Sequence, residues 1–388
     1  MTVRALLLSA AGPVRWLLLV VAFLPLWCSS APLLARVDGR LVLPALARLG
    51  SGDWAWIIAG CLDLAWRLRR RGTSRLLPPL LLVAAVAGAV LGGEATAVRR
   101  AASQAPDPGV ERLLAAPLPW SPGVADPQWI ADPAALREWP PSWRHWLGTD
   151  PGGYDLAARL LHALRGSLGL ALAAAALTSV IGVAVGAACG TLRGVFDLLS
   201  MRAIEVLLCF PHFFLVLIVL TWLPRNGLTL VLLIGATAWT GIARLVRGEF
   251  LRLGDAEFVL AARALGAGRF RVAWRHILPN ALAPLLAATT FAVAAALLTE
   301  FSLSWLGLGV QRGAASLGTM LAEGHSAVQG GAAARLIVAP AAALAAIVLA
   351  FHAVAERLRG ATTPEEPRLH DGGVAAEGER PPGGGALR

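Results

Sequence analysis

Few residues of this 388-residue chain have the type and spacing that chemistry requires. His162, His212 and His352 lie in apolar stretches without a carboxylate at helical spacing, which favours packing or interfacial hydrogen bonding over proton transfer. The His-Glu-x-x-His pattern of zinc proteases does not occur, and Ser167 lacks the Gly-x-Ser-Gly order of intramembrane serine proteases. The four cysteines form no Cys-x-x-Cys pair. The sequence therefore predicts neither a catalytic site nor a metal site.

The basic residues exclude nucleotide hydrolysis by this chain. All 34 of them are arginines, whereas the phosphate-binding loop of ATPases requires a lysine. Two carboxylates border apolar stretches, where an ionisable group is a functional candidate. These are Glu300 and Glu205, and Glu205 can instead pair with the nearby Arg202 at the membrane surface. We therefore expect no enzyme and no bound cofactor.

The composition indicates an all-α polytopic membrane protein rather than a soluble domain. Hydrophobic residues make up 57% of the chain and charged residues 15%, and the mean hydropathy is +0.65. The net charge of +10 is explained by arginines at the cytoplasmic ends of spans, so we expect a lipid membrane and no nucleic acid as partner. The cysteines lie in apolar stretches and are predicted to be small packing residues: Cys28, Cys61, Cys189 and Cys209.

Five apolar stretches in the second half of the chain are long enough to cross a ~30 Å hydrocarbon core as helices. They are residues 167–190, 204–223, 228–246, 281–299 and 334–354. The connection 247–280 carries six arginines, whereas the connection 300–333 carries only Arg312. Because cytoplasmic loops are enriched in arginine, residues 247–280 are predicted inside and 300–333 outside, with both termini cytoplasmic.

The N-terminal membrane region, residues 1–93, is predicted to add spans to this core. An apolar stretch near residues 14–34 favours an uncleaved first span, and residues 35–53 resemble a short extracytoplasmic ribbon. Two further apolar runs flank five arginines between Arg67 and Arg75, which predicts an extra hairpin with a cytoplasmic turn. The expected core has about six spans, or about eight if this hairpin forms.

Two segments lack apolar continuity. Residues 94–166 are predicted to be an extracytoplasmic loop, whose tryptophans either lie at the membrane interface or fill a small loop core. Both readings stay open for Trp120, Trp129, Trp139, Trp143 and Trp146. Residues 361–388 are rich in Pro, Gly, Glu and Arg and are predicted to form a disordered cytoplasmic tail.

The basic loop (residues 247–280) separates two apolar stretches and is predicted to contain two short helices. Apolar and small side chains recur at i, i+3, i+4 and i+7 in both. The first set is Phe258, Ala261, Ala262 and Leu265, and the second begins with Phe270, Ala273, Trp274 and Ile277. Gly266 and Gly268 break the run between them, and Pro279 is expected to stop the second helix.

The residues of the basic loop resemble a known motif. The order Glu-Phe-Val-Leu-Ala-Ala-Arg-Ala-Leu-Gly-Ala, from Glu257, followed by Arg-His-Ile-Leu-Pro-Asn, from Arg275, is similar to the EAA loop of binding-protein-dependent ABC importer permeases. The resemblance is to the second permease subunit of the dipeptide, oligopeptide and nickel importers. One departure is Leu260, where the wider pattern has a glutamate before Ala-Ala. A polar contact at that position is absent here or is supplied by Glu257.

This resemblance implies a type I ABC importer transmembrane domain in the bacterial inner membrane, with residues 167–360 as the permease core. It implies a second permease subunit, two cytoplasmic ATPase subunits that hold ATP and Mg, and an extracytoplasmic substrate-binding protein as partners. The positions implied to couple to the ATPases are Glu257, Ala261, Ala262, Arg263, Gly266, Ala267 and Pro279. Glu300 and Ser304, within a further matching stretch, are implied candidates for the translocation path.

The resemblance extends over roughly residues 145–360. The stretch from His145 to Asp155 is similar to a motif of the family that precedes the core, except that Tyr154 replaces an arginine. Peptide is the commonest cargo of such importers, but the sequence does not identify the substrate. The alternatives are an ion-coupled secondary transporter, for which no convincing internal repeat is visible, and a non-catalytic membrane scaffold.

Overall fold

The computed structural model describes residue 120 and residues 125–131, 138–309 and 316–360, together with the backbone of three strands nearer the N-terminus. The predicted first span, the extra hairpin and the tail 361–388 lie outside the described residues. The same holds for Cys28 and Cys61.

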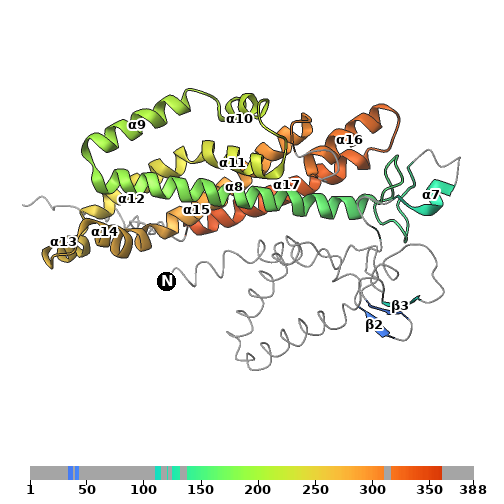
Figure 1. The fold of residues 1–388 in the computed structure, drawn as a ribbon, viewed down its shortest axis with the longest axis horizontal. Helices are drawn as coiled ribbons and strands as arrows, with labels where there is room; N and C mark the ends of the chain where they lie inside the picture. The colour runs from blue at the N-terminus through green and yellow to red at the C-terminus, as the bar shows by residue number, and fades with distance from the viewer. Residues whose placement is uncertain are drawn as a thin grey trace, which may run out of the picture.

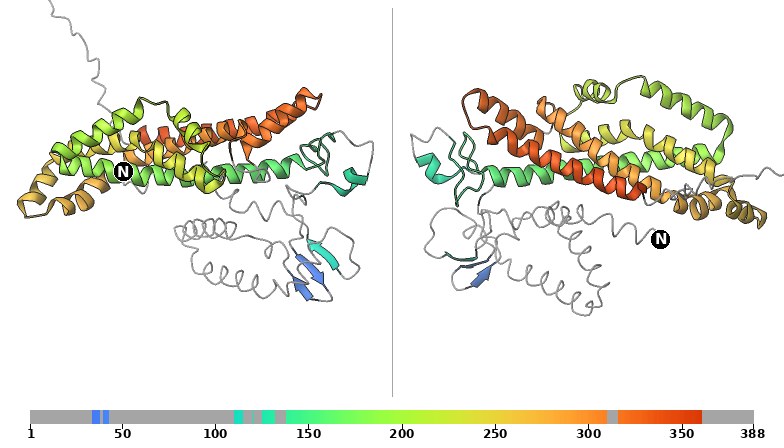
Figure 2. Two further views of the ribbon diagram at one scale, coloured as in Figure 1. Left: turned by 45° about the horizontal axis from the view of Figure 1, so that its top comes forward. Right: turned by 180° about the vertical axis from the view of Figure 1, so that it is seen from behind.

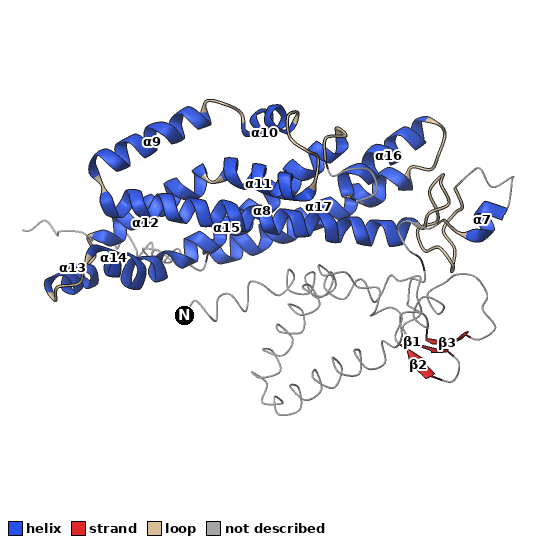
Figure 3. Ribbon diagram, viewed as in Figure 1, coloured by secondary structure: helices blue, strands red, loops and turns tan. Residues whose placement is uncertain are grey.

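Long helices that run side by side form the core (Figure 1). α8 (Leu156–Leu192) lies along α11 (Gly227–Ala238) and α12 (Thr240–Gly254), and α15 (Leu278–Trp305) packs against both α8 and α17 (Arg335–Gly360). Figure 2 shows the same bundle from two further sides, and Figure 3 shows that helices dominate it. The predicted all-α architecture is confirmed for this part of the chain.

Three helices of the described part are long and apolar enough to cross a membrane: Leu156–Leu192, Arg269–Trp305 and Arg335–Gly360. Two bent helix pairs raise this number to five if each pair is one span. The five segments overlap the five predicted apolar stretches, although the second ends at Leu220 and not at residue 223. They are longer than predicted, because their helices continue through the polar residues that flank the apolar ones.

Two of the predicted spans are bent rather than straight. α9 (Gly194–Leu208) and α10 (His212–Leu220) meet at 78°, and Pro211 lies at the break. A proline lacks the backbone N–H of a helix and restricts the residue before it, so the break lies where the sequence requires it. α11 and α12 meet at 43° around Trp239, where no proline accounts for the bend.

Small residues allow α8 and α12 to approach closely. Gly182, Gly186 and Gly190 recur every fourth residue on α8, and a Cβ on any of them would collide with α12 or the residue before it. For Gly186 the obstacle is the backbone carbonyl of Ala243, and for Gly190 it is the side chain of Phe250. This stripe of small residues is typical of helix packing in membranes.

The predicted outer connection 300–333 contains a helix. α15 continues to Trp305, and α16 (Leu317–Gln329) then packs against α15 and α17. Ser316 caps α16, since its hydroxyl accepts from the backbone N–H of Thr319 at 3.1 Å and the Thr319 hydroxyl accepts from Ser316 N–H. Polar caps of this kind allow a helix in a segment that lacks a long apolar run.

The described strands form a small antiparallel sheet in the order β2-β1-β3. β1 (Leu34–Val37) and β2 (Arg40–Val42) pair as a hairpin within the predicted ribbon, and β3 (Val110–Leu114) pairs with β1. The short helix α7 (Pro127–Ala131) follows β3. The segment after residue 94 therefore contains regular structure beyond the predicted loop.

Two apolar clusters stabilise the bundle. The larger lies where α8, α11, α15, α16 and α17 meet and includes Leu168, Leu230, Leu297, Leu303, Leu317 and Phe351. The smaller lies at the other end, under the basic loop, and includes Ile242, Val246, Phe250, Val259, Val272 and Ile277. The second cluster fixes the basic loop to the ends of the spans.

Candidate functional site

The basic loop begins with the last turns of α12 and then turns back as α13 (Glu257–Ala264). Gly266 ends α13 with φ +83°, its N–H donates to Arg263 O at 2.9 Å, and the N–H of Ala267 donates to Ala262 O at 3.0 Å. This hydrogen-bond pair is a Schellman motif, which favours glycine at the left-handed residue. The prediction that Gly266 breaks the run is confirmed.

The predicted apolar face of α13 is mostly exposed. Of its four residues only Ala262 is buried, whereas Phe258 is 43% exposed and Leu265 is 89% exposed. Val259, beside that face, is buried in the smaller cluster. Ala261 and Glu257 are also exposed. The helix therefore anchors on one side and presents Phe258, Ala261 and Leu265 to the surroundings on the other.

The second predicted helix is divided in the same way. It comprises α14 (Arg269–Val272) and a π-helical turn η1 (Ala273–Ile277), in which Ala273 and Ile277 are buried. Phe270 and Trp274 are 76% and 54% exposed, and their ring centroids lie 5.9 Å apart. The exposed aromatic pair extends the apolar surface that α13 presents.

Pro279 does not stop this helix, so that prediction is wrong. The π-helical turn leads directly into α15, and Pro279 lies in the first turn of α15. A proline disrupts a regular α-helix because it lacks the N–H and crowds an earlier carbonyl, and the wider π-turn before it relieves both problems. As a result, the backbone from Arg269 to Trp305 is one continuous helical segment.

The six arginines of the basic loop fall into two groups. Arg247 forms a two-pronged ion pair with Asp197 of α9, at 2.5 and 2.6 Å, and Arg252 pairs with Glu249 at 2.6 Å. The other four make no ion pair or hydrogen bond with any residue that the structure describes. They are Arg263, Arg269, Arg271 and Arg275. Positive charge at the tip of the loop is thus available to a partner.

At the opposite end of α8, buried polar side chains contact one another. His145 is 1% exposed, and its ring nitrogens lie 2.8 Å from Asp155 Oδ2 and 3.0 Å from Asp126 Oδ2. Trp120 stacks on the imidazole with centroids 4.6 Å apart, and Asp155 also caps α8 by accepting from Ala158 N–H at 2.7 Å. We call these residues the outer cluster: Trp120, Asp126, His145 and Asp155.

Arg159 makes a second charged junction close to the outer cluster. Its guanidinium pairs with Asp150 and, at 2.5 Å, with Glu323 of α16. The same guanidinium lies 5.6 Å from the ring centroid of Tyr154, the residue that replaces an arginine in the resembling motif. Sequence reasoning missed Arg159, Glu323 and Asp126, because no local pattern connects positions so far apart in the chain.

The tryptophans before α8 divide between the two predicted roles. Trp120 is 7% exposed and belongs to the outer cluster, as expected for a small loop core. Trp143 is fully exposed and Trp146 is 56% exposed, as expected for residues at a membrane interface. Neither single reading describes the whole set.

Glu300 and Ser304 lie together in the interior. Glu300 is fully buried, and the Ser304 hydroxyl donates to its Oε1 at 2.7 Å. Oε2 has no hydrogen-bond partner within the described residues, although the hydroxyls of Ser167 and Ser316 lie beside the carboxyl group. The pair thus joins α15 to the neighbourhood of α8 and α16.

The other candidate residues make contacts within the bundle or on its surface. His162 and His352 contact backbone oxygens one turn earlier in their own helices, and His212 lies 2.9 Å from the hydroxyl of Thr237. Cys189 is buried as predicted, whereas Cys209 is exposed in this chain at the bend between α9 and α10. Glu205 forms the predicted surface pair with Arg202 at 2.6 Å. Among the residues described, no group of three His, Cys, Asp or Glu side chains could hold a metal ion.

Comparison with known proteins places the chain in a family. Residues 182–364 match the family described as binding-protein-dependent transport system inner membrane component. The dipeptide transport system permease protein DppC of Bacillus subtilis is 35% identical over 226 residues, which are 58% of this chain and 70% of that protein. The chain belongs to this family.

Two further permeases are similar. The oligopeptide transport system permease protein OppC of Bacillus subtilis is 39% identical over 189 residues, 49% of this chain and 62% of that protein. OppC of Mycobacterium tuberculosis H37Rv is 34% identical over 235 residues, 60% of this chain and 80% of that protein. The solved MetNI methionine ABC transporter aligns over 54% of this chain and 98% of that chain at 19% identity with a TM-score of 0.45, too low for any argument.

Membership of this family shows what kind of protein the chain is. It is a permease subunit of an ABC importer and a multi-pass protein of the inner membrane. Permease subunits of this kind are not catalytic and carry no cofactor, in agreement with the missing lysine. A binding-protein-dependent importer also requires ATPase subunits and a binding protein. The family match begins at residue 182, and the assignment of residues 1–93 as a separate membrane region stays a prediction.

Proposed function

We propose that this permease is the second permease subunit of an ATP-driven importer of oligopeptides or dipeptides. The names of the relatives support this substrate class. In the proposed assembly, a second permease completes the translocation path, two ATPase subunits bind on the cytoplasmic side, and a binding protein delivers the peptide from outside. Both termini of the chain and the basic loop face the cytoplasm in this orientation, as the arginine distribution requires.

The two-sided burial of α13 carries the proposal. Val259 fixes the helix to the smaller cluster, while Phe258, Ala261 and Leu265 are exposed. Exposed apolar side chains on a charged loop are typical of a protein interface with an apolar centre and a polar rim. We assign Phe258, Ala261 and Leu265 to the centre of an ATPase contact, and Glu257 and Arg263 to its rim.

The connections of α13 suggest how the contact moves the spans. α12 leads into α13 on one side, and on the other the continuous helical segment from Arg269 carries the chain into α15. Ala267 and Gly266 form the tight turn between them, and Pro279 lies where the π-turn joins α15. A displacement of α13 by ATP-driven closure of the ATPases would tilt α12 and α15 together and alternate access to the central path.

The outer end has a different task in this proposal. The junction of Asp150, Arg159 and Glu323 holds α8 to α16 next to the surface where a binding protein would dock. Glu300 and Ser304 stay candidates for the path, which would open between α8, α15 and α16 in another conformation. Their buried hydrogen bond would close the path in the conformation described here.

A bulky residue at the centre of the α13 face tests the proposal. In the Ala261→Trp variant, we expect ATPase subunits to copurify roughly tenfold less well or worse, because the indole prevents close approach at the interface centre. Peptide uptake by the reconstituted transporter should be lost, and membrane insertion should be unchanged. The matched control is Ala295→Trp, an exposed position of α15 away from the loop, which should retain the ATPase subunits. Normal uptake by the Ala261→Trp transporter would refute the coupling role of α13.

A further inference from the structure

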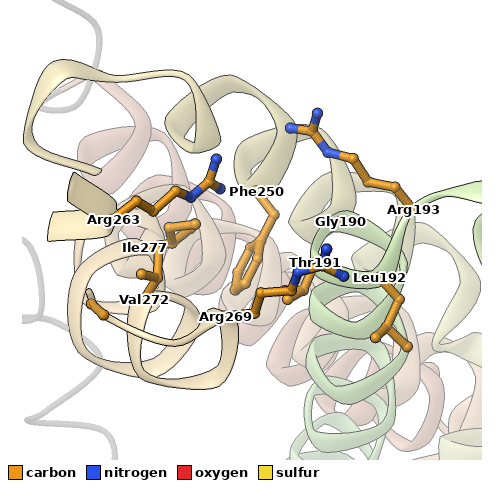
Figure 4. Close-up of a pocket in the computed structure, with 10 residues that line it drawn as sticks. Gly190, Thr191, Leu192, Arg193, Phe250, Arg263, Arg269, Val272 and Ile277 are labelled. Atoms are coloured by element: carbon orange, nitrogen blue, oxygen red, sulfur yellow. The ribbon is translucent and has the colours of Figure 1, made fainter. Parts of the chain in front are cut away.

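A pocket of ≈ 410 Å³ lies between the end of α8 and the basic loop. Figure 4 shows the ring of Phe250 at its centre, with the basic loop on one side and the last turn of α8 on the other. The residues that line it are Gly190, Thr191, Leu192, Arg193, Phe250, Arg263, Ala267, Arg269, Val272 and Ile277. The pocket thus combines guanidinium groups with an apolar wall.

The positive charge in the pocket is poorly compensated. Arg263 and Arg269 have no ion-pair or hydrogen-bond partner among the residues that the structure describes. Arg193 has one carboxylate, Asp255, at 3.6 Å, and that carboxylate side chain is 75% exposed. Guanidinium groups repel one another unless an anion lies between them, and their fork of N–H donors suits phosphate oxygens. The charge therefore points to a bound anion.

A buried hydroxyl in the pocket wall supports the same conclusion. Thr191 Oγ1 is inaccessible to solvent and has no hydrogen-bond partner within the described residues. Buried hydroxyl groups nearly always have a partner, so this unpaired one marks a polar contact in the pocket wall that the present conformation leaves unmade. Arg193 follows in the left-handed region, with φ +53°, a conformation that a non-glycine residue adopts only where its surroundings enforce it.

The apolar surroundings identify the source of the anion. Leu192 lines the pocket and is 55% exposed, and it leads to Val195 and Phe196 of α9, which are 73% and 46% exposed. Such a surface at the end of a membrane span suits acyl chains. A basic pocket between spans on the cytoplasmic side is a known way of binding anionic lipid headgroups.

We propose that this pocket binds the phosphate headgroup of an anionic phospholipid in the cytoplasmic leaflet. The guanidinium group of Arg269 donates to the phosphate oxygens, Arg263 adds positive charge to the lining, and the acyl chains follow Leu192 onto α9. The Thr191 hydroxyl, which solvent does not reach in this conformation, joins the headgroup when the pocket wall shifts to admit it. The assignment to the cytoplasmic leaflet rests on the orientation given under the proposed function. A lipid at this place braces the basic loop against α8.

The test measures lipid retained by the assembled transporter, purified with its partner subunits and exchanged into nanodiscs. The discs contain phosphatidylethanolamine with phosphatidylglycerol, and native mass spectrometry counts the phosphatidylglycerol that stays bound. We expect Arg269→Gln to weaken retention about fivefold, since one arginine at an anionic membrane surface contributes on the order of 1 kcal/mol. Thr191→Val, which removes only the hydroxyl, should also reduce retention.

The matched control is Arg271→Gln. Arg271 lies two residues from Arg269, is exposed and carries the same charge, but it does not line the pocket. Retention should equal that of the unmodified transporter. Equal losses of bound lipid in Arg269→Gln and Arg271→Gln would mean that general surface charge, and not the pocket, retains the lipid. Equal retention in all variants would also contradict the proposed site.

A second arm distinguishes the lipid from a free anion. Discs of phosphatidylethanolamine alone are supplied with inorganic phosphate, which should not be retained in an Arg269-dependent way if the acyl chains contribute. Retention of inorganic phosphate that Arg269→Gln abolishes would contradict the lipid assignment. Because the readout is lipid binding and not uptake, its failure would leave the coupling role of α13 standing.

Discussion

The two ends of the bundle differ in how their charged residues are paired. One end carries α13 and α14, and the other lies near α7 and α16 (Figure 1). At the outer end, both ring nitrogens of His145 face carboxylates and Arg159 bridges two acidic residues. At the end that carries α13 and α14, Arg263 and Arg269 lack such partners among the described residues, and the aromatic rings of Phe270 and Trp274 are uncovered. The outer end satisfies its polar groups within one chain, whereas the inner end offers them to other molecules.

This contrast separates structural residues from interface residues. Removing one partner of a buried polar pair costs much folding stability, because the other group is then left unpaired in the interior. An exposed apolar or basic side chain contributes little to the folded chain itself, and its removal is felt only when a partner binds. Substitutions at the two ends should therefore differ in what they damage, and the following variants test that difference.

The largest effect on stability is expected for Asp155→Ala in the outer cluster. The change removes a hydrogen-bond partner of buried His145 and the cap of α8; an unpaired buried polar group costs about 1–3 kcal/mol, and the lost cap adds about 1 kcal/mol. Thermal unfolding of the purified full chain should show a clearly lower midpoint. The control is Glu205→Ala, which breaks an exposed ion pair and should cost about 1 kcal/mol or less. Equal stability of the two variants would contradict the claim that the buried contacts at this end stabilise the fold more than exposed ion pairs do.

A moderate effect is expected at the turn of the basic loop. Gly266 has φ +83°, so Gly266→Ala should destabilise the turn by about 1–2 kcal/mol, and Gly266→Pro, which cannot adopt this φ, should abolish uptake while insertion is preserved. Peptide uptake and membrane insertion are measured in parallel.

Gly268→Ala is the matched control for this turn. Gly268 lies in the same loop with φ −66°, and nothing lies within 4 Å of a Cβ added there. Gly268→Ala should therefore transport normally. Loss of uptake in this variant as well would mean that the loop tolerates no change at all, and the special role of the Gly266 turn would be lost.

The smallest effect on stability is expected for Phe258→Ser on the exposed face of α13. The free energy of unfolding should change by about 1 kcal/mol or less, because Phe258 is 43% exposed and belongs to neither apolar cluster. Binding of the ATPase subunits should nevertheless weaken by more than about 1 kcal/mol. Calorimetry of the chain and a titration with ATPase subunits give the two numbers. A large loss of stability would show that Phe258 is structural, contrary to the comparison.

The sequence predicts the bundle well because hydrophobic length and arginine distribution are local properties. The two helices of the basic loop and the break at Gly266 also follow from local spacing and turn chemistry. The burial of individual residues could not be predicted in this way. The spacing of Phe258, Ala261, Ala262 and Leu265 defines an apolar face, but it does not indicate which residues pack within this chain and which stay exposed for a partner. Val259, the most buried residue of α13, lies beside that face.

Other errors have specific physical causes. Pro279 usually ends a helix, but a π-turn before it lets the helix continue into α15. The outer cluster joins Asp126 to His145 and Asp155 through contacts that no sequence period encodes. The bend at Pro211 could have been predicted from the proline itself, since the apolar run 204–223 is interrupted there.

The most direct test of the account is a pull-down of the tagged full chain from its native membrane, followed by mass spectrometry and an ATPase assay of the eluate. The account predicts that a second permease and ATPase subunits accompany the chain, with ATPase activity, and that both the ATPase subunits and the activity are lost from the Ala261→Trp variant. Recovery of a stable chain alone, without ATPase subunits, would contradict the coupling role of α13 and the basic loop.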